Sequence, residues 1–316
     1  MKSILITGAH RSGSTWVGSM FNLSSRVKLI NEPFHIENSK NLYALDFIDY
    51  WFYYLTEDDI QKYFKRLEHV YGITYTLSDL IINFNRINFM RGKLGAIKNF
   101  FFFKLYKDIV QIRPVVKDPL AFFSAERLFN ILQPEMLILI RHPAAFVSSI
   151  KRMSEVEKEW GVNFMFDWIA LKEFHPAISE KYKNEIIELK ESVSWLSGGI
   201  LLWRIFHETI LYYKNKFAND WHFVKHEDLS RDPVSEFKTL FAAFSIPFTQ
   251  KIEREIIINT GGGNPIEVTG KKLHHLKRNS KEAIFNWKNR LTDHEIQFIY
   301  DSTNDLSLNF YDNNEW

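Results

Sequence analysis

The sequence predicts an α/β fold in which a parallel sheet is flanked by helices. Two observations lead to this prediction: short apolar runs alternate with helical patterns, and each apolar run is followed by a polar or charged residue. In sheets of this kind, ligands bind at the carboxyl ends of the strands. The expected strands are residues 3–7, 27–30, 112–117, 136–141 and 221–225.

The first expected strand leads into a glycine-rich loop. Gly8 and Gly13 stand five residues apart, as in the G-x-x-x-x-G-K-[ST] loop of nucleoside triphosphatases, but Ser14 occupies the lysine position. Backbone N–H groups in such a turn, together with the start of the next helix, form a cradle for a tetrahedral anion. Arg11 supplies a cation from inside the loop. We therefore predict a P-loop-type sheet without the lysine that ATPase chemistry needs.

The strand at 136–141 ends in Arg141, at a place where a triphosphatase often carries the Asp that holds its metal. Arginine binds phosphate through its forked N–H groups and offers no ligand to magnesium. Ser148 and Ser149 follow on the next expected helix. This segment predicts a phosphate clamp, and it argues against a P-loop kinase that moves phosphate.

Two stretches between the expected strands are too long for simple crossovers. Residues 38–110 carry helix signals such as the acidic first turn Thr56-Glu57-Asp58-Asp59, and residues 155–218 form a second helical block. A chain of 316 residues that is 46% hydrophobic can bury one large core. We therefore predict a single domain over 1–316, with helical insertions at 38–110 and 155–218 and a flexible loop at 260–280.

With these features the chain resembles the sulfotransferase superfamily, whose members move a sulfuryl group from 3'-phosphoadenosine 5'-phosphosulfate (PAPS) to a hydroxyl or amine. The resemblance rests on Arg-Ser-Gly-Ser-Thr at 11–15, and on Arg141 and Ser149, spaced eight apart like the family's 3'-phosphate pair. Weaker similarities favour the bacterial and carbohydrate branch. They are Asn31-Glu32-Pro33-Phe34, Val116-Lys117-Asp118-Pro119, residues 223–229 around His226-Glu227-Asp228-Leu229, and Lys277-Arg278-Asn279-Ser280.

The resemblance implies a donor site at the loop and an acceptor cleft built by the helical insertions, with residues 260–280 closing over the donor. PAPS would be the co-substrate, and no metal would be needed because PAPS already carries the activated group. Trp16 could pack against the adenine, although a position in the core is the stronger interpretation. The implied donor-binding residues are Arg11, Ser12, Gly13, Ser14, Thr15, Trp16, Arg141, Ser149, His226, Lys277, Arg278 and Ser280.

The expected catalytic residues are Glu32 as the base, Arg11 for charge on the transferred group and Lys117 at the bridging oxygen. Alternatives stay open: Glu32 caps its turn or pairs with Arg11, Asp118 holds Lys117, and His35 is the second candidate base. His226 stands where the family has a tyrosine that contacts adenine. A histidine there can stack, but it ordinarily titrates near neutral pH.

Composition sets limits on partners and compartment. Forty basic and 38 acidic side chains give a net charge of +2, which does not favour nucleic acid as a partner. The sequence has no cysteine and hence no disulfide or thiolate metal site, and its histidines show no metal-binding spacing. Met1-Lys2-Ser3 leads directly into the first strand without a signal peptide, and no apolar run approaches the ~20 residues needed to cross a bilayer. These features predict a cytoplasmic enzyme.

Residues 84–107 alternate phenylalanines with arginines and lysines. Such a stretch suits contact with an anionic glycan or a membrane surface, although buried helix packing of the four phenylalanines at 100–103 is the stronger interpretation. We predict a glycan or glycolipid as the acceptor. The alternatives are a non-catalytic anion-binding or membrane-surface module on the same frame and, less favoured, the kinase. No sequence feature indicates an oligomeric state.

Overall fold

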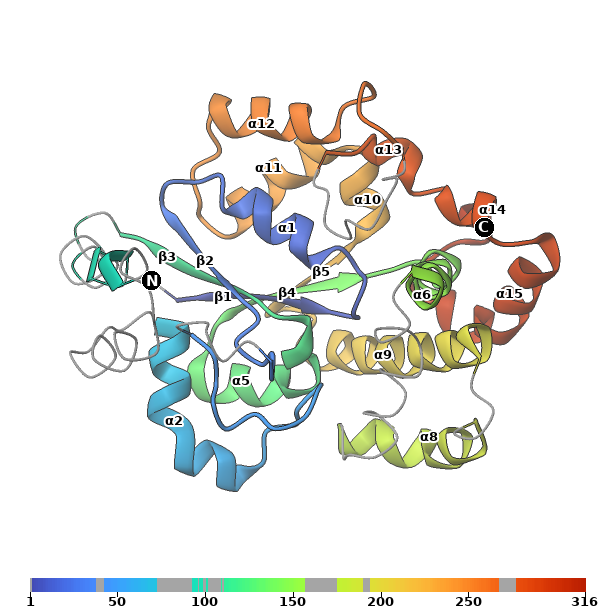
Figure 1. Ribbon diagram of the computed structural model, residues 1–316, viewed down its shortest axis with the longest axis horizontal. Coiled ribbons are helices and arrows are strands. Elements are labelled where there is room, and N and C mark those ends of the chain that lie inside the picture. The colour runs from blue at the N-terminus through green and yellow to red at the C-terminus, as the bar shows by residue number, and fades with distance from the viewer. Residues whose placement is uncertain are drawn as a thin grey trace.

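The computed structural model describes residues 2–37, 43–72, 111–156, 175–189, 194–266 and 277–316, together with 93–95, 97, 98, 101 and 109. Its centre is one sheet of five parallel strands in the order β2-β3-β1-β4-β5 (Figure 1). The α/β prediction is confirmed, and each strand boundary lies within one residue of its expected position. The strands are β1 (Ile4–Gly8), β2 (Val27–Asn31), β3 (Arg113–Lys117), β4 (Glu135–Ile140) and β5 (Trp221–Lys225).

Alternate residues of the central strands face two separate cores, as the two-residue period of a strand dictates. Ile4 and Ile6 of β1 face one core and Leu5 faces the other. The first core is closed by α1 (Ser14–Phe21), α10 (His226–Arg231), α11 (Pro233–Ala243) and α12 (Gln250–Thr260).

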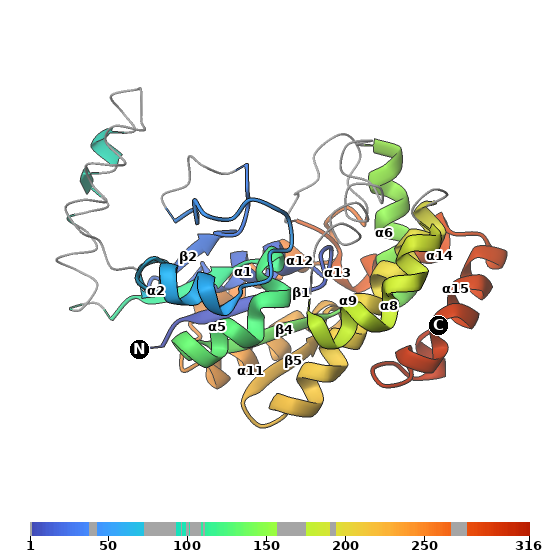
Figure 2. The same ribbon diagram turned by 90° about the horizontal axis from the view of Figure 1, so that it is seen from below.

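The second core lies on the opposite face of the sheet, where the helices of the predicted insertions gather (Figure 2). In the first insertion, Thr56 and Asp59 bond to each other at the start of a helix, as the acidic first turn predicts. The elements on this face are α2 (Glu57–Gly72), the 3-10 helix η1 (Pro119–Ser124), α5 (Ala125–Leu132), α6 (Pro143–Val156), α8 (Pro176–Leu189) and α9 (Trp195–Phe217).

The C-terminal part returns alongside α6 and α9 (Figure 1). Its elements are α13 (Ser280–Ala283), α14 (Asn286–Arg290), α15 (Asp293–Ser307) and the 3-10 helix η3 (Asn313–Glu315). Among the described residues, no helix combines the length and apolar character that crossing a bilayer requires. Phe101 has 54% of its surface exposed, whereas most of the predicted basic and aromatic stretch 84–107 lies outside the described residues.

Candidate functional site

A cavity of about 480 Å³ opens at the carboxyl ends of the strands, where parallel sheets bind ligands. It gathers residues that are far apart in the sequence, from the β1–α1 loop to α14. Of the predicted site residues, Ser12, Lys117 and Lys277 are not part of its lining. Those that line it are Arg11, Gly13, Ser14, Thr15, Trp16, Glu32, Arg141, Ser149, His226, Arg278 and Ser280.

The glycine-rich loop presents the N-terminus of α1 to this cavity. Gly13 precedes the helix with φ 89°, and no side chain caps the first turn. Its left-handed backbone suits glycine, and an added Cβ would lie 2.4 Å from Nδ1 of His226. The uncapped N–H groups of the first turn therefore remain available to an anion. Ser14 and Thr15 stand beside them.

Ser12 departs from its predicted role as a ligand donor. Its hydroxyl donates to the Ala9 carbonyl oxygen at 2.6 Å, and its backbone N–H donates to the same oxygen at 3.1 Å. The side chain is fully buried. Both donors are thus used inside the loop, so Ser12 shapes the cradle and does not project into it.

Arginines dominate the charge of the cavity. The pKa of Arg11 is lowered to about 10. The main cause is burial of its guanidinium away from water, and the second is repulsion by Arg141, Arg278 and other arginines. Arg152 and Arg290 also line the cavity, although the sequence pattern assigned them no role. Glu32 is the one carboxylate among the described lining residues. A cavity with this excess of cations suits a ligand that carries several negative charges.

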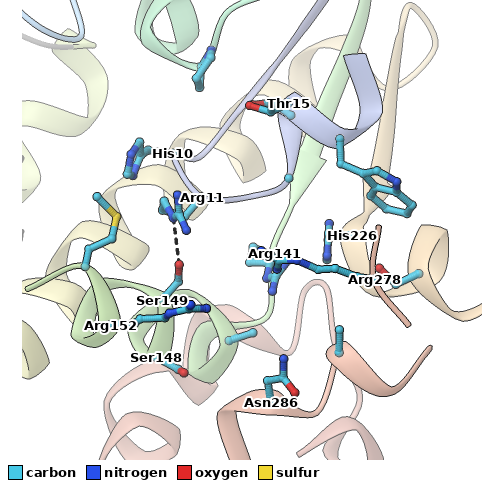
Figure 3. A pocket seen from close by; sticks show the side chains of 18 of the residues that line it. His10, Arg11, Thr15, Arg141, Ser148, Ser149, Arg152, His226, Arg278 and Asn286 are labelled. Carbon is cyan, nitrogen blue, oxygen red and sulfur yellow. Dashed lines mark hydrogen bonds between the residues drawn. The ribbon is translucent and has the colours of Figure 1, made fainter. Parts of the chain in front are cut away.

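Arg11 bridges the loop and the helix after β4. Its backbone has φ 68°, an uncommon conformation for a residue with a side chain. Its Nε donates to Oγ of Ser149 on α6 at 2.9 Å (Figure 3). Arg11, which was predicted to act on the transferred group, is therefore hydrogen-bonded directly to Ser149, which was predicted to bind the 3'-phosphate.

Arg141 is held by its own backbone and by a buried acid. Its carbonyl oxygen accepts from Nε1 of Trp203 at 2.9 Å, and its N–H donates to Nε2 of His207 at 3.2 Å. Its side-chain Nε lies 3.5 Å from Oε1 of Glu227. Glu227 stands in a segment that carries the family resemblance, but no pattern in the sequence connects it to Arg141.

Glu32 and Lys117 meet at the ends of the neighbouring strands β2 and β3. Their side chains form an ion pair, and the Glu32 N–H donates to the Lys117 carbonyl oxygen at 2.8 Å. Lys117 is nearly buried, whereas the Glu32 side chain is 26% exposed. The Lys117 ammonium contacts Glu32, and Lys117 is not among the residues that line the cavity, so its contact with the donor stays a prediction.

The partners of Glu32 and Asp118 distinguish the alternative roles of these residues. Glu32 pairs with Lys117 and not with Arg11. The buried Asp118 accepts hydrogen bonds from the backbone N–H groups of Phe34 and Leu120, so it fixes the chain after β2 and β3. Burial raises the pKa of Asp118 to about 7.

His35 and His10 also line the cavity. The His35 ring meets the Trp51 ring edge to face, with ring centres 4.5 Å apart. His10 comes from the glycine-rich loop, and Figure 3 shows it beside Arg11. His10 carried no signal in the sequence. Apolar side chains line the cavity too, among them Trp51, Phe52, Pro119, Leu120 and Met153.

His226 occupies the place predicted for adenine contact. Its ring packs edge to face on Trp16 at 5.5 Å, and Trp16 packs in turn on Phe237 at 5.2 Å. The pKa of His226 lies well below its usual value because the ring is buried and because Arg141 and Arg278 are close. The expectation that this ring titrates near neutral pH is therefore wrong, and the ring remains neutral.

Part of the predicted donor-closing loop reaches the cavity. Arg278 lines it, and its backbone N–H is fixed by the Asn259 carbonyl oxygen at 2.9 Å. Ser280 borders the cavity, but its hydroxyl donates to the Ser230 carbonyl oxygen at 2.8 Å and serves the fold. Lys277 is exposed and is not among the residues that line the cavity. Residues 267–276 lie outside the described part of the chain.

Within the described residues, no group of three His, Cys, Asp or Glu side chains is placed to hold a metal ion. The chemical resources of the cavity are instead a helix N-terminus, several guanidinium groups, a carboxylate paired to a lysine, and aromatic rings. This combination can bind a polyanionic nucleotide and place a base beside it.

Comparisons with known proteins agree with the fold. No curated protein matches the sequence. The solved sulfotransferase domain from the curacin biosynthetic pathway shares the fold, with a TM-score of 0.50, 14% identity, and coverage of 96% of this chain and 97% of that one.

Two further solved structures are less similar. A sulfotransferase domain from the olefin synthase of Synechococcus PCC 7002 has a TM-score of 0.46 and 15% identity, over 98% of this chain and 94% of that one. A mouse sulfotransferase complexed with PAP has a TM-score of 0.46 and 13% identity, over 98% and 85%. The family model of the sulfotransferase domain matches residues 1–306, and the chain therefore belongs to the sulfotransferase family.

Proposed function

We propose that this sulfotransferase takes its sulfuryl group from PAPS and transfers it to an acceptor hydroxyl at the cavity. The observation that carries the proposal is the cluster of Arg11, Arg141 and Arg278 around an uncapped helix N-terminus. PAPS bears a 5'-phosphosulfate and a 3'-phosphate on one adenosine. Two separated anionic groups match a site in which one set of donors lies on the loop and another on β4 and the closing loop.

Two buried polar atoms of the cavity residues lack hydrogen-bond partners, and this donor could supply them. Nε of Arg141 is buried without a hydrogen-bond partner, and so is Nδ1 of His226. Buried polar atoms without partners are costly, and a bound ligand commonly satisfies them. We assign the 3'-phosphate to Arg141, Ser149 and Arg278. The adenine then lies near Trp16 and His226, whose neutral ring can stack or accept a hydrogen bond.

The reaction requires the acceptor oxygen and the leaving phosphate to lie in line about sulfur. The oxygen–sulfur bond to the acceptor forms while the sulfur–oxygen bond to the phosphate breaks, and the phosphate keeps the electron pair. Glu32 takes the proton of the acceptor hydroxyl. Arg11 and the α1 N–H groups stabilise charge on the sulfuryl oxygens and the leaving phosphate. Lys117 holds the Glu32 carboxylate through their ion pair.

For the acceptor we propose a glycan or a glycolipid. The lining of the cavity combines the aromatic rings of Trp51 and Phe52 with the polar rings of His10 and His35. A sugar ring has an apolar face that packs on aromatic side chains and hydroxyl groups that bond to imidazoles. We place the reaction in the cytoplasm, in keeping with a sequence without cysteine.

The donor assignment is tested by calorimetric binding of 3'-phosphoadenosine 5'-phosphate (PAP), 5'-AMP and ATP without metal. Wild-type protein should bind PAP at least tenfold more tightly than 5'-AMP. Arg141→Ala should lose that preference, while Arg127→Ala, which removes a cation that pairs with Glu57 at the surface, should keep it. Equal affinity of wild-type protein for PAP and 5'-AMP would exclude PAPS as the donor. A radiolabelled PAPS screen of glycans and glycolipids then tests the acceptor.

A further inference from the structure

The C-terminal segment, residues 308–316, contributes a buried tyrosine to the back of the cavity wall. Tyr311 has 1% of its surface exposed. Its hydroxyl donates to Oε2 of Glu227 at 2.8 Å. The two residues are 84 positions apart, so this contact depends wholly on how the segment returns to the sheet.

The other oxygen of Glu227 faces the proposed phosphate clamp. Oε1 accepts from the His142 N–H at 3.2 Å and lies 3.5 Å from Nε of Arg141. Tyr311, Glu227 and Arg141 therefore form a continuous chain of contacts. It runs from the C-terminal segment into the cavity.

Several contacts fix the C-terminal segment in this position. The Trp316 ring packs on His142 at 4.5 Å, and the main-chain oxygen of Trp316 accepts from Nζ of Lys288 at 3.0 Å. Glu315 pairs with Lys225 at 3.1 Å. These contacts anchor the segment just beyond Tyr311, at Glu315 and Trp316, so the Tyr311 hydroxyl is held in place.

This fixed point decides where the Arg141 guanidinium lies. A free arginine side chain loses much rotamer entropy when it is held in one place, so a fixed partner makes that cost smaller on binding. Nε of Arg141 lies 3.5 Å from Oε1 of Glu227, and this contact with a buried carboxylate orients the arginine side chain. Without the Tyr311 hydroxyl, the Glu227 carboxylate would lose the donor that holds its far oxygen and would be free to turn.

We propose that Tyr311 is a positioning residue for recognition of the donor's 3'-phosphate, and that it acts through Glu227 on Arg141. Tyr311 and Glu227 do not line the cavity themselves. The inference rests on the proposed function, because it takes Arg141 as the 3'-phosphate contact. It adds that the C-terminal segment of this chain takes part in donor selection.

The test compares binding of PAP and of 5'-AMP, two probes that differ in the 3'-phosphate alone. Tyr311→Phe keeps the ring against His142 and removes the hydroxyl. Glu227→Asp keeps the charge beside Arg141 and shortens the carboxylate by one methylene group. In both variants we expect the PAP affinity to fall about three- to tenfold while the 5'-AMP affinity stays within twofold of wild type.

Tyr300→Phe is the matched control. Its hydroxyl also ties the C-terminal segment, through Oδ1 of Asn313 at 3.2 Å, but it is not connected to Arg141. This variant should keep the full preference for PAP, and thermal unfolding of each variant shows that it is folded at the assay temperature. A folded Tyr311→Phe or Glu227→Asp protein with the wild-type preference overturns the inference, and so does an equal loss in Tyr300→Phe. A wild-type protein without the preference would instead overturn the proposed function.

Discussion

Glu32 and Lys117 form an ion pair across the ends of β2 and β3, and the same two residues are joined by a backbone hydrogen bond of 2.8 Å. Glu32 has φ 46°, an unfavourable backbone conformation for a glutamate. Such strain is commonly found where a side chain must be aimed at a ligand. The pair directs a carboxylate toward the cavity while the lysine stays nearly buried behind it.

Glu32→Gln should therefore remove the base and leave donor binding intact. Positioned acid–base groups contribute on the order of 10²- to 10⁴-fold, so we expect kcat to fall by that factor. Calorimetry should give a PAP affinity within threefold of wild type. Glu57→Gln, which changes a surface carboxylate paired with Arg127, is the control and should keep kcat. A Glu32→Gln enzyme with wild-type kcat would remove Glu32 from the proton transfer.

The sequence predicted the parts of the fold and site that depend on local pattern. The apolar runs predicted the strands, and the spacing of the glycines predicted the loop that contains Arg11. Roles that depend on side-chain direction were predicted less well, because Ser12 and Lys117 turn toward Ala9 and Glu32, contacts that only the assembled sheet creates. The low pKa of His226 likewise follows from burial beside arginines.

Residues that the sequence analysis missed carry weak local signals or none. Arg152 follows Ser149 by three positions on α6, so helical spacing places both on one side of that helix and would have indicated it. Arg290 and Tyr311 have no such signal. Their position depends on how α14 and the C-terminal segment return to the sheet, which no short-range pattern encodes.

Gly13→Ala should destabilise the protein and abolish donor binding. Its φ of 89° disfavours a side chain, and the new methyl group would collide with the His226 ring. Conformational strain of this kind costs about 1–3 kcal/mol, which denaturant unfolding measures. Combining Gly13→Ala with His226→Ala should restore part of the lost unfolding free energy, because it removes the collision.

Gly262→Ala is the control for this substitution. A Cβ at position 262 would meet no atom within 4 Å. Alanine there restricts the unfolded chain, so we expect a gain of about 0.4–1 kcal/mol. A stable Gly13→Ala protein that still binds PAP would mean that the loop does not need its left-handed turn.

His142→Phe should make the protein more stable, and increasingly so in acid. Both ring nitrogens of His142 are buried without hydrogen-bond partners, and the ring stacks on Trp287 at 5.3 Å, a contact that phenylalanine can keep. Burial, together with Arg141 and other cations, lowers the pKa of His142 from 6.5 to about 3. Between these two values the unfolded chain binds a proton that the folded chain does not.

The stability associated with the neutral ring is therefore complete above pH 6.5 and is lost as the pH falls toward 3. The free-energy advantage of His142→Phe should grow by about 1.4 kcal/mol per pH unit over that window. Urea unfolding of both proteins at pH 5, 6 and 8 measures it. If the difference in unfolding free energy between the two proteins stays constant from pH 8 to pH 5, His142 takes up its proton in the folded state.

Ser149→Ala should weaken donor binding, whereas Ser148→Ala should not. The Ser149 hydroxyl accepts from Nε of Arg11 inside the cavity, and Figure 3 shows the neighbouring Ser148 side chain directed away from Arg11. Loss of one hydrogen bond to a phosphate costs about 1.4 kcal/mol, a tenfold loss of PAP affinity. The Ser148 hydroxyl is buried without a hydrogen-bond partner, so its removal should slightly raise the unfolding free energy. Calorimetry on both variants distinguishes the two serines, and a larger loss in Ser148→Ala would transfer the 3'-phosphate contact to Ser148.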